Sequence, residues 1–204
     1  MITTIYLVRH GDMVKKIGDP PLNSLGKEEA AKTGKYFLDK NIDLILSSPQ
    51  KRALQTAEII QKTLKTPPLK VNDILKERIN FGDVKNQTYP EFLEMWQKSS
   101  VERDWILPNG ESSISAGRRM ESVIPILALG AFRNIILATH GGIILDFLKN
   151  AFPEKELNKK MPAIDQKHKS AIKTCSITKI EVDGNNLKLI SVGNTDHLLD
   201  LGEE

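Results

Sequence analysis

Three segments of this sequence share one order: a short apolar run, then a polar turn, then apolar residues at helical spacing. The apolar runs fall within Thr4–Val8, Asp43–Ser48 and Asn134–Gly142. A chain in which strands and helices alternate in this way folds into layers, with helices covering a largely parallel sheet. The alternation therefore predicts an α/β fold before any single residue is considered.

Polar residues between the runs indicate where the helices begin. Asn23 is suited to cap the first helix, because its side chain can accept a bond from a free backbone N–H group. Ser48 is suited to cap the second helix, with Pro49 at the first helical position. This reading places Arg52 in or beside the first turn of that helix.

Two parts of the chain depart from the alternation. "CSITKIEV" and "LKLISV" flank Asp183-Gly184-Asn185, a pattern typical of a hairpin, and predict antiparallel strands at a sheet edge. Residues from about 81 to 125 show no clear strand and predict a mostly helical insertion. The insertion could form a lid, although for most of its aromatic residues the favoured interpretation is that they only pack the insertion on the core. We expect residues 1–204 to form a single domain with this insertion.

Composition and charge argue against several classes of protein. The chain has 29 basic and 26 acidic residues, and the basic ones are scattered rather than gathered in a stripe, so we expect no nucleic-acid partner. Its one cysteine, Cys175, excludes an intrachain disulfide. The first apolar run is short, and no apolar stretch is long enough to span a bilayer. We expect a soluble, cytoplasmic protein with no membrane partner.

Four basic side chains lie where the predicted strands end. Arg9 and His10 follow the first strand, and Arg52 and His140 follow the second and third. In open α/β sheets, ligands bind at the carboxyl ends of the strands. Read singly, each arginine fits a solvated surface charge as well as a binding residue, and each histidine fits a structural residue better than a catalytic one. Their shared position at strand ends instead predicts one cationic pocket.

Such a pocket suits a phosphate ester. The arginine fork matches phosphate oxygens, and neutral imidazole can attack phosphorus. A leaving alkoxide needs a proton, for which Glu77 in "ILKERINFGD" is the candidate donor. Read alone, between two basic residues, Glu77 fits a surface charge better. We interpret His168 and His197 as structural.

The motifs that carry these residues match a known family. "LVRHGD", "SSPQKRALQTAE", "LKERINFGD", "NGES" and "THGG", in this order, resemble the histidine phosphatase superfamily, the phosphoglycerate-mutase-like proteins. The end of the chain, from "CSITKIEV" onward, resembles the small cobalamin-pathway (alpha-ribazole phosphatase-like) and broad-specificity phosphatases. The chain departs from many members at two places. It has Asp12 where they have a glutamate, and it lacks their Trp-Asn pair, whose asparagine contacts phosphate; Lys16 stands near that asparagine position.

The resemblance implies a role for each matching residue. It implies a three-layer α/β/α sandwich with a mostly parallel central sheet, and neither a metal nor another cofactor. His10 would carry the phosphoryl group and Glu77 would donate the proton. The substrate-binding residues would be Arg9, His10, Asn23, Arg52, His140 and Gly141.

Several alternatives stay open at this stage. The leading interpretation is a phosphatase that acts on a small phosphorylated metabolite, and the short, irregular insertion favours it over a phosphoglycerate-type mutase. A second alternative is a non-catalytic phosphate-binding protein on the same fold. A third is a metallohydrolase, against which the lack of a compact HxxxH or HxH motif argues. The assembly also stays open, with a homodimer as one option.

Overall fold

Six strands form the central sheet of the computed structural model, which describes residues 1–161, 172–184 and 186–199. They are β1 (Thr3–Arg9), β2 (Leu44–Ser47), β3 (Leu69–Val71), β4 (Asn134–Thr139), β5 (Ile177–Asp183) and β6 (Asn186–Asn194). Their order across the sheet is β3-β2-β4-β1-β5-β6. The first four strands in this order are parallel, and β5 and β6 are added by antiparallel pairing. The predicted mostly parallel sheet with an antiparallel edge is confirmed.

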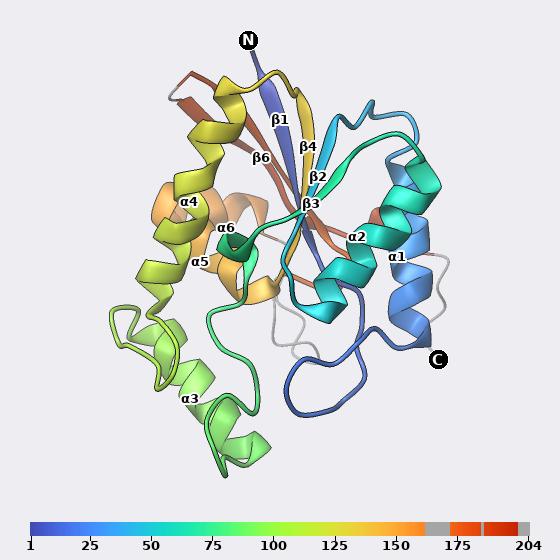
Figure 1. Ribbon diagram of the computed structural model, residues 1–204. Coiled ribbons are helices and arrows are strands. Elements are labelled where there is room, and N and C mark those ends of the chain that lie inside the picture. Colours follow the sequence, from blue (N-terminus) through green and yellow to red (C-terminus); the bar gives the residue numbers. More distant parts are fainter. Residues whose placement is uncertain (162–171, 185, 200–204) are drawn as a thin grey trace.

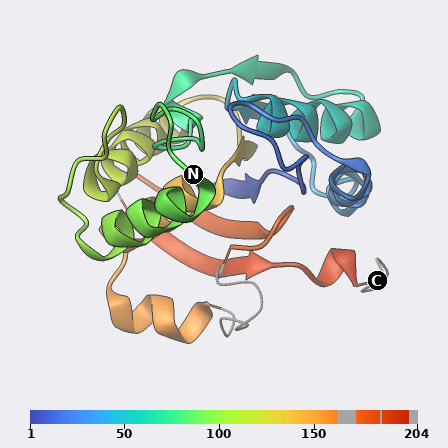
Figure 2. The ribbon, with the colours of Figure 1, turned by 90° about the horizontal axis from the view of Figure 1, so that it is seen from below.

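Helices cover both faces of the sheet, which gives the expected three layers (Figures 1 and 2). They are α1 (Ser24–Tyr36), α2 (Lys51–Leu64), α3 (Tyr89–Val101), α4 (Ser113–Leu129), α5 (Gly141–Ala151) and α6 (Glu154–Lys160). One face packs against α1 and α2, and the other against α4, α5 and α6. Helix α3 lies beyond the end of α4, away from the strands (Figure 1). Short 3₁₀ turns occupy Asp73–Leu75 and Asp196–Leu198.

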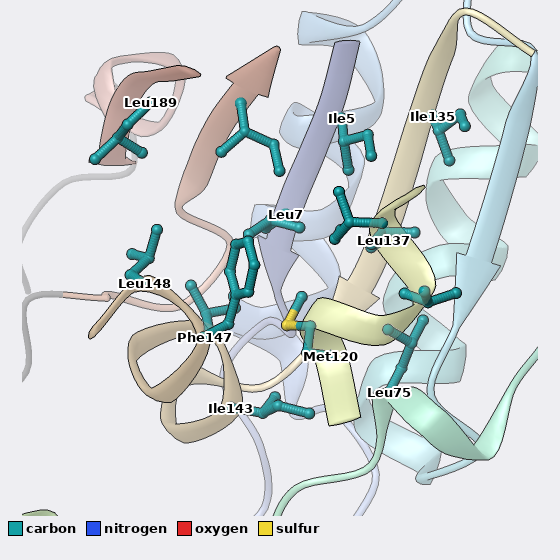
Figure 3. Close-up of a cluster of buried hydrophobic side chains, with 14 of the residues drawn as sticks. Ile5, Leu7, Leu75, Met120, Ile135, Leu137, Ile143, Phe147, Leu148 and Leu189 are labelled. Atoms are coloured by element: carbon teal, nitrogen blue, oxygen red, sulfur yellow. The ribbon is translucent and has the colours of Figure 1, made fainter. Parts of the chain in front are cut away.

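Alternate residues of each central strand enter two different cores. Ile5 and Leu7 of β1 join Met120 and Phe147 in the core beneath α4 and α5 (Figure 3). Val8, with its neighbours on the opposite face, packs under α1 and α2. Because both faces are covered, the central strands are continuous apolar runs rather than alternating ones.

The strand register brings the predicted site together. Arg9 of β1 pairs with Thr139 of β4, and Ala138 of β4 pairs with Ser47 of β2. The residues that follow these positions must therefore emerge side by side at one edge of the sheet. Two further backbone bonds, from His10 N to Thr139 O (2.9 Å) and from Ser48 N to Ala138 O, extend the pairing into the turns.

One predicted cap is confirmed and one is wrong. The Asn23 side chain accepts a bond from the Gly26 backbone, as expected of an N-cap. Helix α2, however, begins at Lys51 rather than at Pro49, and Ser48 does not cap it. The Lys51 N–H group is instead satisfied by the carboxylate of Asp19 at 2.9 and 3.1 Å. A cap supplied from a distant loop leaves no local sequence signal.

The region predicted to be a helical insertion contains α3 and most of α4. Helix α4 contributes Met120, Val123 and Ile124 to the main core, so this part belongs to the layer over the sheet. The division into one domain with an insertion stays a prediction.

His168 and Asn185 lie outside the described residues. No helix in the described ranges is long and apolar enough to cross a membrane.

Two glycines allow the turn after β1 to lie directly on helix α1. A Cβ atom added to Gly26 would overlap the carbonyl oxygen of Asp12, and one added to Gly11 would overlap the carbonyl oxygen of Gly26. Neither neighbour is a flexible side-chain end, since both are backbone atoms. The position of the Arg9–Gly11 turn therefore depends on the missing side chains.

We expect Gly26→Ala to destabilise the protein and to displace this turn. Overpacking a tight site costs about 1–3 kcal/mol, and backbone atoms on both sides favour the upper end of that range. Urea unfolding would measure the loss of stability. The exposed Lys27 on the same helix supplies the control, Lys27→Ala. Equal stability of the two variants would show that the turn and α1 can separate without cost.

Candidate active site

The side chains at the carboxyl edge of the sheet form one buried cluster. His10 follows β1, His140 follows β4, and Arg52 lies in the first turn of α2. The rings of His10 and His140 lie 5.2 Å apart between centroids. All three side chains are buried. The structure thus brings together residues that are far apart in the sequence: Arg52 lies 42 positions after His10, and His140 lies 88 positions after Arg52.

His10 is held in one tautomer. Its Nδ1 atom lies 2.8 Å from the carbonyl oxygen of Gly11, and Nε2 lies 3.1 Å from the donating Nε–H group of Arg52. A carbonyl can only accept and an arginine can only donate, so Nδ1 carries the proton and Nε2 has the lone pair. Burial, and then the charges of Arg9 and Arg52, hold the pKa of His10 well below its usual value. The ring is therefore neutral at pH 7.

His140 lies at the N-terminal end of α5, where it occupies the N-cap position. Its Nε2 atom bonds to the hydroxyl of Ser48 at 2.9 Å. Its Nδ1 atom is buried and has no hydrogen-bond partner among the described residues. Burial, and then the charge of Arg52, also hold the pKa of His140 well below its usual value.

The two arginines are held differently. The guanidinium of Arg52 donates to His10 and also to the side-chain oxygen of Asn80 at 2.9 Å, and it lies 3.7 Å from the carboxylate of Asp19. Arg9 donates to the carbonyl oxygen of Ile172 at 2.5 Å. Its Nε atom is buried without a hydrogen-bond partner among the described residues. Such a donor is costly unless a ligand accepts from it.

Two amide side chains complete the site, and the sequence analysis did not find either. Gln50 accepts a bond from the backbone of Glu77 at 2.9 Å and donates to Asn80 at 2.6 Å. Asn80 in turn accepts from Arg52. The pair therefore connects the start of α2 to the loop that carries Glu77. Amides are common in loops, and nothing in their spacing marks these two.

Glu77 lies over the N-terminus of α5. Its Oε2 atom accepts a bond from the Gly142 N–H group at 2.9 Å, and Oε1 accepts from the backbone of Arg78 at 3.0 Å. Glu77 is half-buried beside helix α5, at whose N-terminal end His140 lies. This placement argues against the reading of Glu77 as an ordinary surface charge.

The residue after Glu77 anchors its loop in the protein interior. Arg78 is buried, pairs with Asp146 of α5 at 2.6 Å and donates to the hydroxyl of Ser113. The ring of Trp96 lies 3.9 Å from the guanidinium carbon, a cation–π contact. Burial raises the pKa of Asp146 to about 6, although Arg78 opposes the shift. The loop is thus attached to α5 at two successive residues, Glu77 and Arg78.

Two residues expected to bind substrate have other contacts. Asn23 uses its oxygen to cap α1, and its amide nitrogen donates to Asp12 at 2.7 Å. Gly141 packs against the side chain of Arg9, whose Cδ atom would lie 3.2 Å from a Cβ at that position. A role for either residue in binding substrate stays a prediction.

A cavity of about 400 Å³ lies beside the loop that carries Glu77. Its lining residues are Asp19, Pro49, Gln50, Lys76, Glu77, Arg78, Ile79, Asn80, Asp83 and Asn109. The cavity therefore borders the amide pair and Glu77 rather than His10. Within the described ranges, His, Cys, Asp and Glu side chains do not gather in a group of three or more that could hold a metal ion.

This arrangement has counterparts among known proteins. The family model described as histidine phosphatase superfamily (branch 1) matches residues 5–195 of the chain. The chain belongs to the histidine phosphatase superfamily. The family and enzyme class predicted from the sequence motifs are confirmed.

Relatives of this histidine phosphatase carry both phosphatase and mutase names. It is 31% identical over 151 residues to a Bacillus subtilis protein named "Uncharacterized phosphatase PhoE", covering 70% of this chain and 74% of the relative. It is 26% identical to "Probable phosphoglycerate mutase GpmB" of Proteus mirabilis, covering 97% and 95%. The solved structure "Bacillus stearothermophilus YhfR" is 26% identical, has a TM-score of 0.74, and covers 96% of this chain and 99% of that one.

The burial of the two histidines leads to a spectroscopic prediction. In this histidine phosphatase, the rings of His10 and His140 should stay neutral as the pH falls through 6.5, because their pKa values lie well below that value. NMR of ¹⁵N-labelled imidazole groups would report both protonation and tautomer. The urea-unfolded protein, in which the histidines titrate near 6.5, is the control. A midpoint at or above 6.5 for folded His10 would contradict the assignment.

Proposed function

We propose that this chain hydrolyses a small-molecule phosphomonoester through a phosphohistidine formed at His10. The observation that supports this most directly is the state of the His10 ring. It is neutral, its tautomer is fixed by Gly11, and the lone pair on Nε2 lies beside the Arg52 guanidinium. A nucleophile and the cation that would hold its phosphate target therefore meet at one point.

The first half of the proposed reaction transfers the phosphoryl group to the protein. The Nε–H group of Arg52 turns from Nε2 of His10 to a phosphate oxygen, which frees the lone pair on Nε2. Nε2 then attacks phosphorus in line with the ester oxygen, a P–N bond forms, and the P–O bond to the alcohol breaks. Arg9, Arg52 and His140 surround the three remaining oxygens. The buried Arg9 Nε and His140 Nδ1 atoms gain hydrogen-bond partners in this way, which explains why both are otherwise unsatisfied.

Glu77 is the proposed acid and base. Its proton passes to the departing alkoxide, which is strongly basic and needs one as the P–O bond breaks. In the second half, the Glu77 carboxylate takes a proton from water as the water attacks phosphorus. The P–N bond breaks, phosphate leaves, and His10 returns to its neutral state. Every proton is accounted for by Glu77 and water.

A mutase is the second candidate, because a relative whose match covers 97% of this chain carries that name. The first half of its reaction is the same, but a second alcohol oxygen replaces water in the attack on the phosphohistidine. Transfer of labelled phosphate between phosphoglycerates, measured against release of free phosphate, would separate the two activities.

We expect His10→Ala to lower kcat by at least about 1,000-fold, which is the scale seen when a nucleophile is lost. Rapid quench with labelled substrate should trap an alkali-stable phosphoryl group on the wild type and none on the variant. His197→Gln, which changes a histidine packed beside α1, is the control and should keep the intermediate. Near-normal turnover by folded His10→Ala would contradict the assignment of His10 as the nucleophile.

We expect Glu77→Gln to distinguish good leaving groups from poor ones. An alkyl phosphate releases a strongly basic alkoxide and should lose roughly 100- to 10,000-fold in kcat, the usual scale of general acid catalysis. p-Nitrophenyl phosphate leaves with little help and should lose much less. The exposed Glu94 of α3 supplies the control, Glu94→Gln. Equal losses on both esters would mean that Glu77 only positions the loop or the phosphate.

A further inference from the structure

Four aromatic side chains form a continuous row between the site and the outer end of α3. We name Phe81, Tyr89, Phe92 and Trp96 the aromatic wall. Ring centroids lie 5.3 Å apart for Phe81 and Tyr89, 5.6 Å for Phe81 and Phe92, and 5.9 Å for Phe92 and Trp96. These separations are those of contacting aromatic pairs. The wall is therefore one apolar surface and not four separate residues.

The inner end of the wall reaches the proposed acid. A Cβ atom placed on Gly142 would lie 2.6 Å from Oε1 of Glu77 and 2.7 Å from the ring edge of Trp96. The Glu77 carboxyl and the Trp96 ring therefore meet over the first turn of α5. Because Glu77 must contact the leaving oxygen, the group attached to that oxygen begins beside Trp96.

The outer part of the wall is open, unlike aromatic residues that only fill a core. Tyr89 is 56% exposed, and Ser99 is the one residue buried in α3, whose residues are all described. The loop across from the wall is also apolar at its tip. Ile17 is 63% exposed, and its Cγ2 atom occupies the space where a Cβ of Gly82 would lie. The backbone bond from Gly18 to Phe81 at 2.8 Å holds this loop to the start of the wall.

The arginines around the wall are already used inside the protein. Arg78 pairs with Asp146, Arg103 donates to Asn150 at 2.6 Å, and Arg119 pairs with Glu111. A substrate with a second anionic group would need a free cation here. The exposed cations of the facing loop are Lys15 and Lys16, on flexible side chains. Lys76, which lines the cavity beside Glu77, is paired with Asp73 at 2.8 Å. That cavity is mainly polar, whereas the surface on the Trp96 side of Glu77 is the apolar aromatic wall.

We propose that the alcohol half of the substrate carries an aromatic ring or a similarly flat apolar group that lies against the aromatic wall. This inference rests on the proposed phosphatase function and names the substrate class for the same site. Stacking of a substrate ring on Phe92 and Trp96 removes apolar surface from water and adds a ring–ring contact. The phosphate is bound at the strand ends, and the wall then selects the alcohol.

The test compares two esters that both release a primary alkoxide, 2-phenylethyl phosphate and glycerol 1-phosphate. The wild type should show a kcat/KM at least about tenfold higher for the phenylethyl ester, the change expected from one good aromatic contact. Phe92→Ala should reduce that ratio roughly tenfold. Val101→Ala, which truncates an apolar side chain of α3 that is 77% exposed, should leave the ratio unchanged.

The outcomes separate this inference from the proposed function. Hydrolysis of both esters with similar kcat/KM, or a ratio that Phe92→Ala does not change, would overturn the substrate class and leave the phosphatase intact. A higher kcat/KM for 3-phosphoglycerate than for the phenylethyl ester would also overturn it. No hydrolysis of either ester or of p-nitrophenyl phosphate by the folded protein would overturn both.

Discussion

The hydrogen bond from the buried Arg52 guanidinium to Nε2 of His10 is the contact on which the rest of the site depends. A buried cation is stable only when acceptors surround it. Here the acceptors come from three separate segments: the turn after β1, the loop at Asn80 and the loop at Asp19. By accepting from Arg52 or pairing with it, each of these three segments is held next to the same guanidinium. A single side chain thus aligns His10, the Asn80 loop that also carries Glu77, and the loop at Asp19.

The main features of the fold and the cationic centre could be predicted from the sequence because they follow from local patterns. Alternating strands and helices predict a parallel sheet, and the ends of parallel strands meet at one edge, so Arg9, His10, Arg52 and His140 could be grouped before their distances were known. The Asn23 cap depends on residues only three positions apart. The family resemblance then added a predicted role for each residue.

The remaining features depend on contacts between distant parts of the chain. Asp19 caps the N-terminus of helix α2 from a loop 32 residues away, and for this reason the sequence placed the start of that helix too early. Arg78 looks like a surface charge beside Lys76 and Glu77, yet it is buried against Asp146, 68 positions later. Gln50 and Asn80 matter only because Arg52 and Glu77 lie beside them. No local periodicity reports such pairs.

The strand register makes the site a sensitive indicator of correct sheet assembly. His10 and His140 come one residue after the paired positions Arg9 and Thr139. A slip of β4 by a single residue would turn its side chains to the opposite face and carry His140 out of the cluster. Misaligned sheets could still bury much of the same apolar surface and look folded by spectroscopy. Recovery of catalytic turnover during refolding would therefore count only those molecules in which the central strands have found their native alignment.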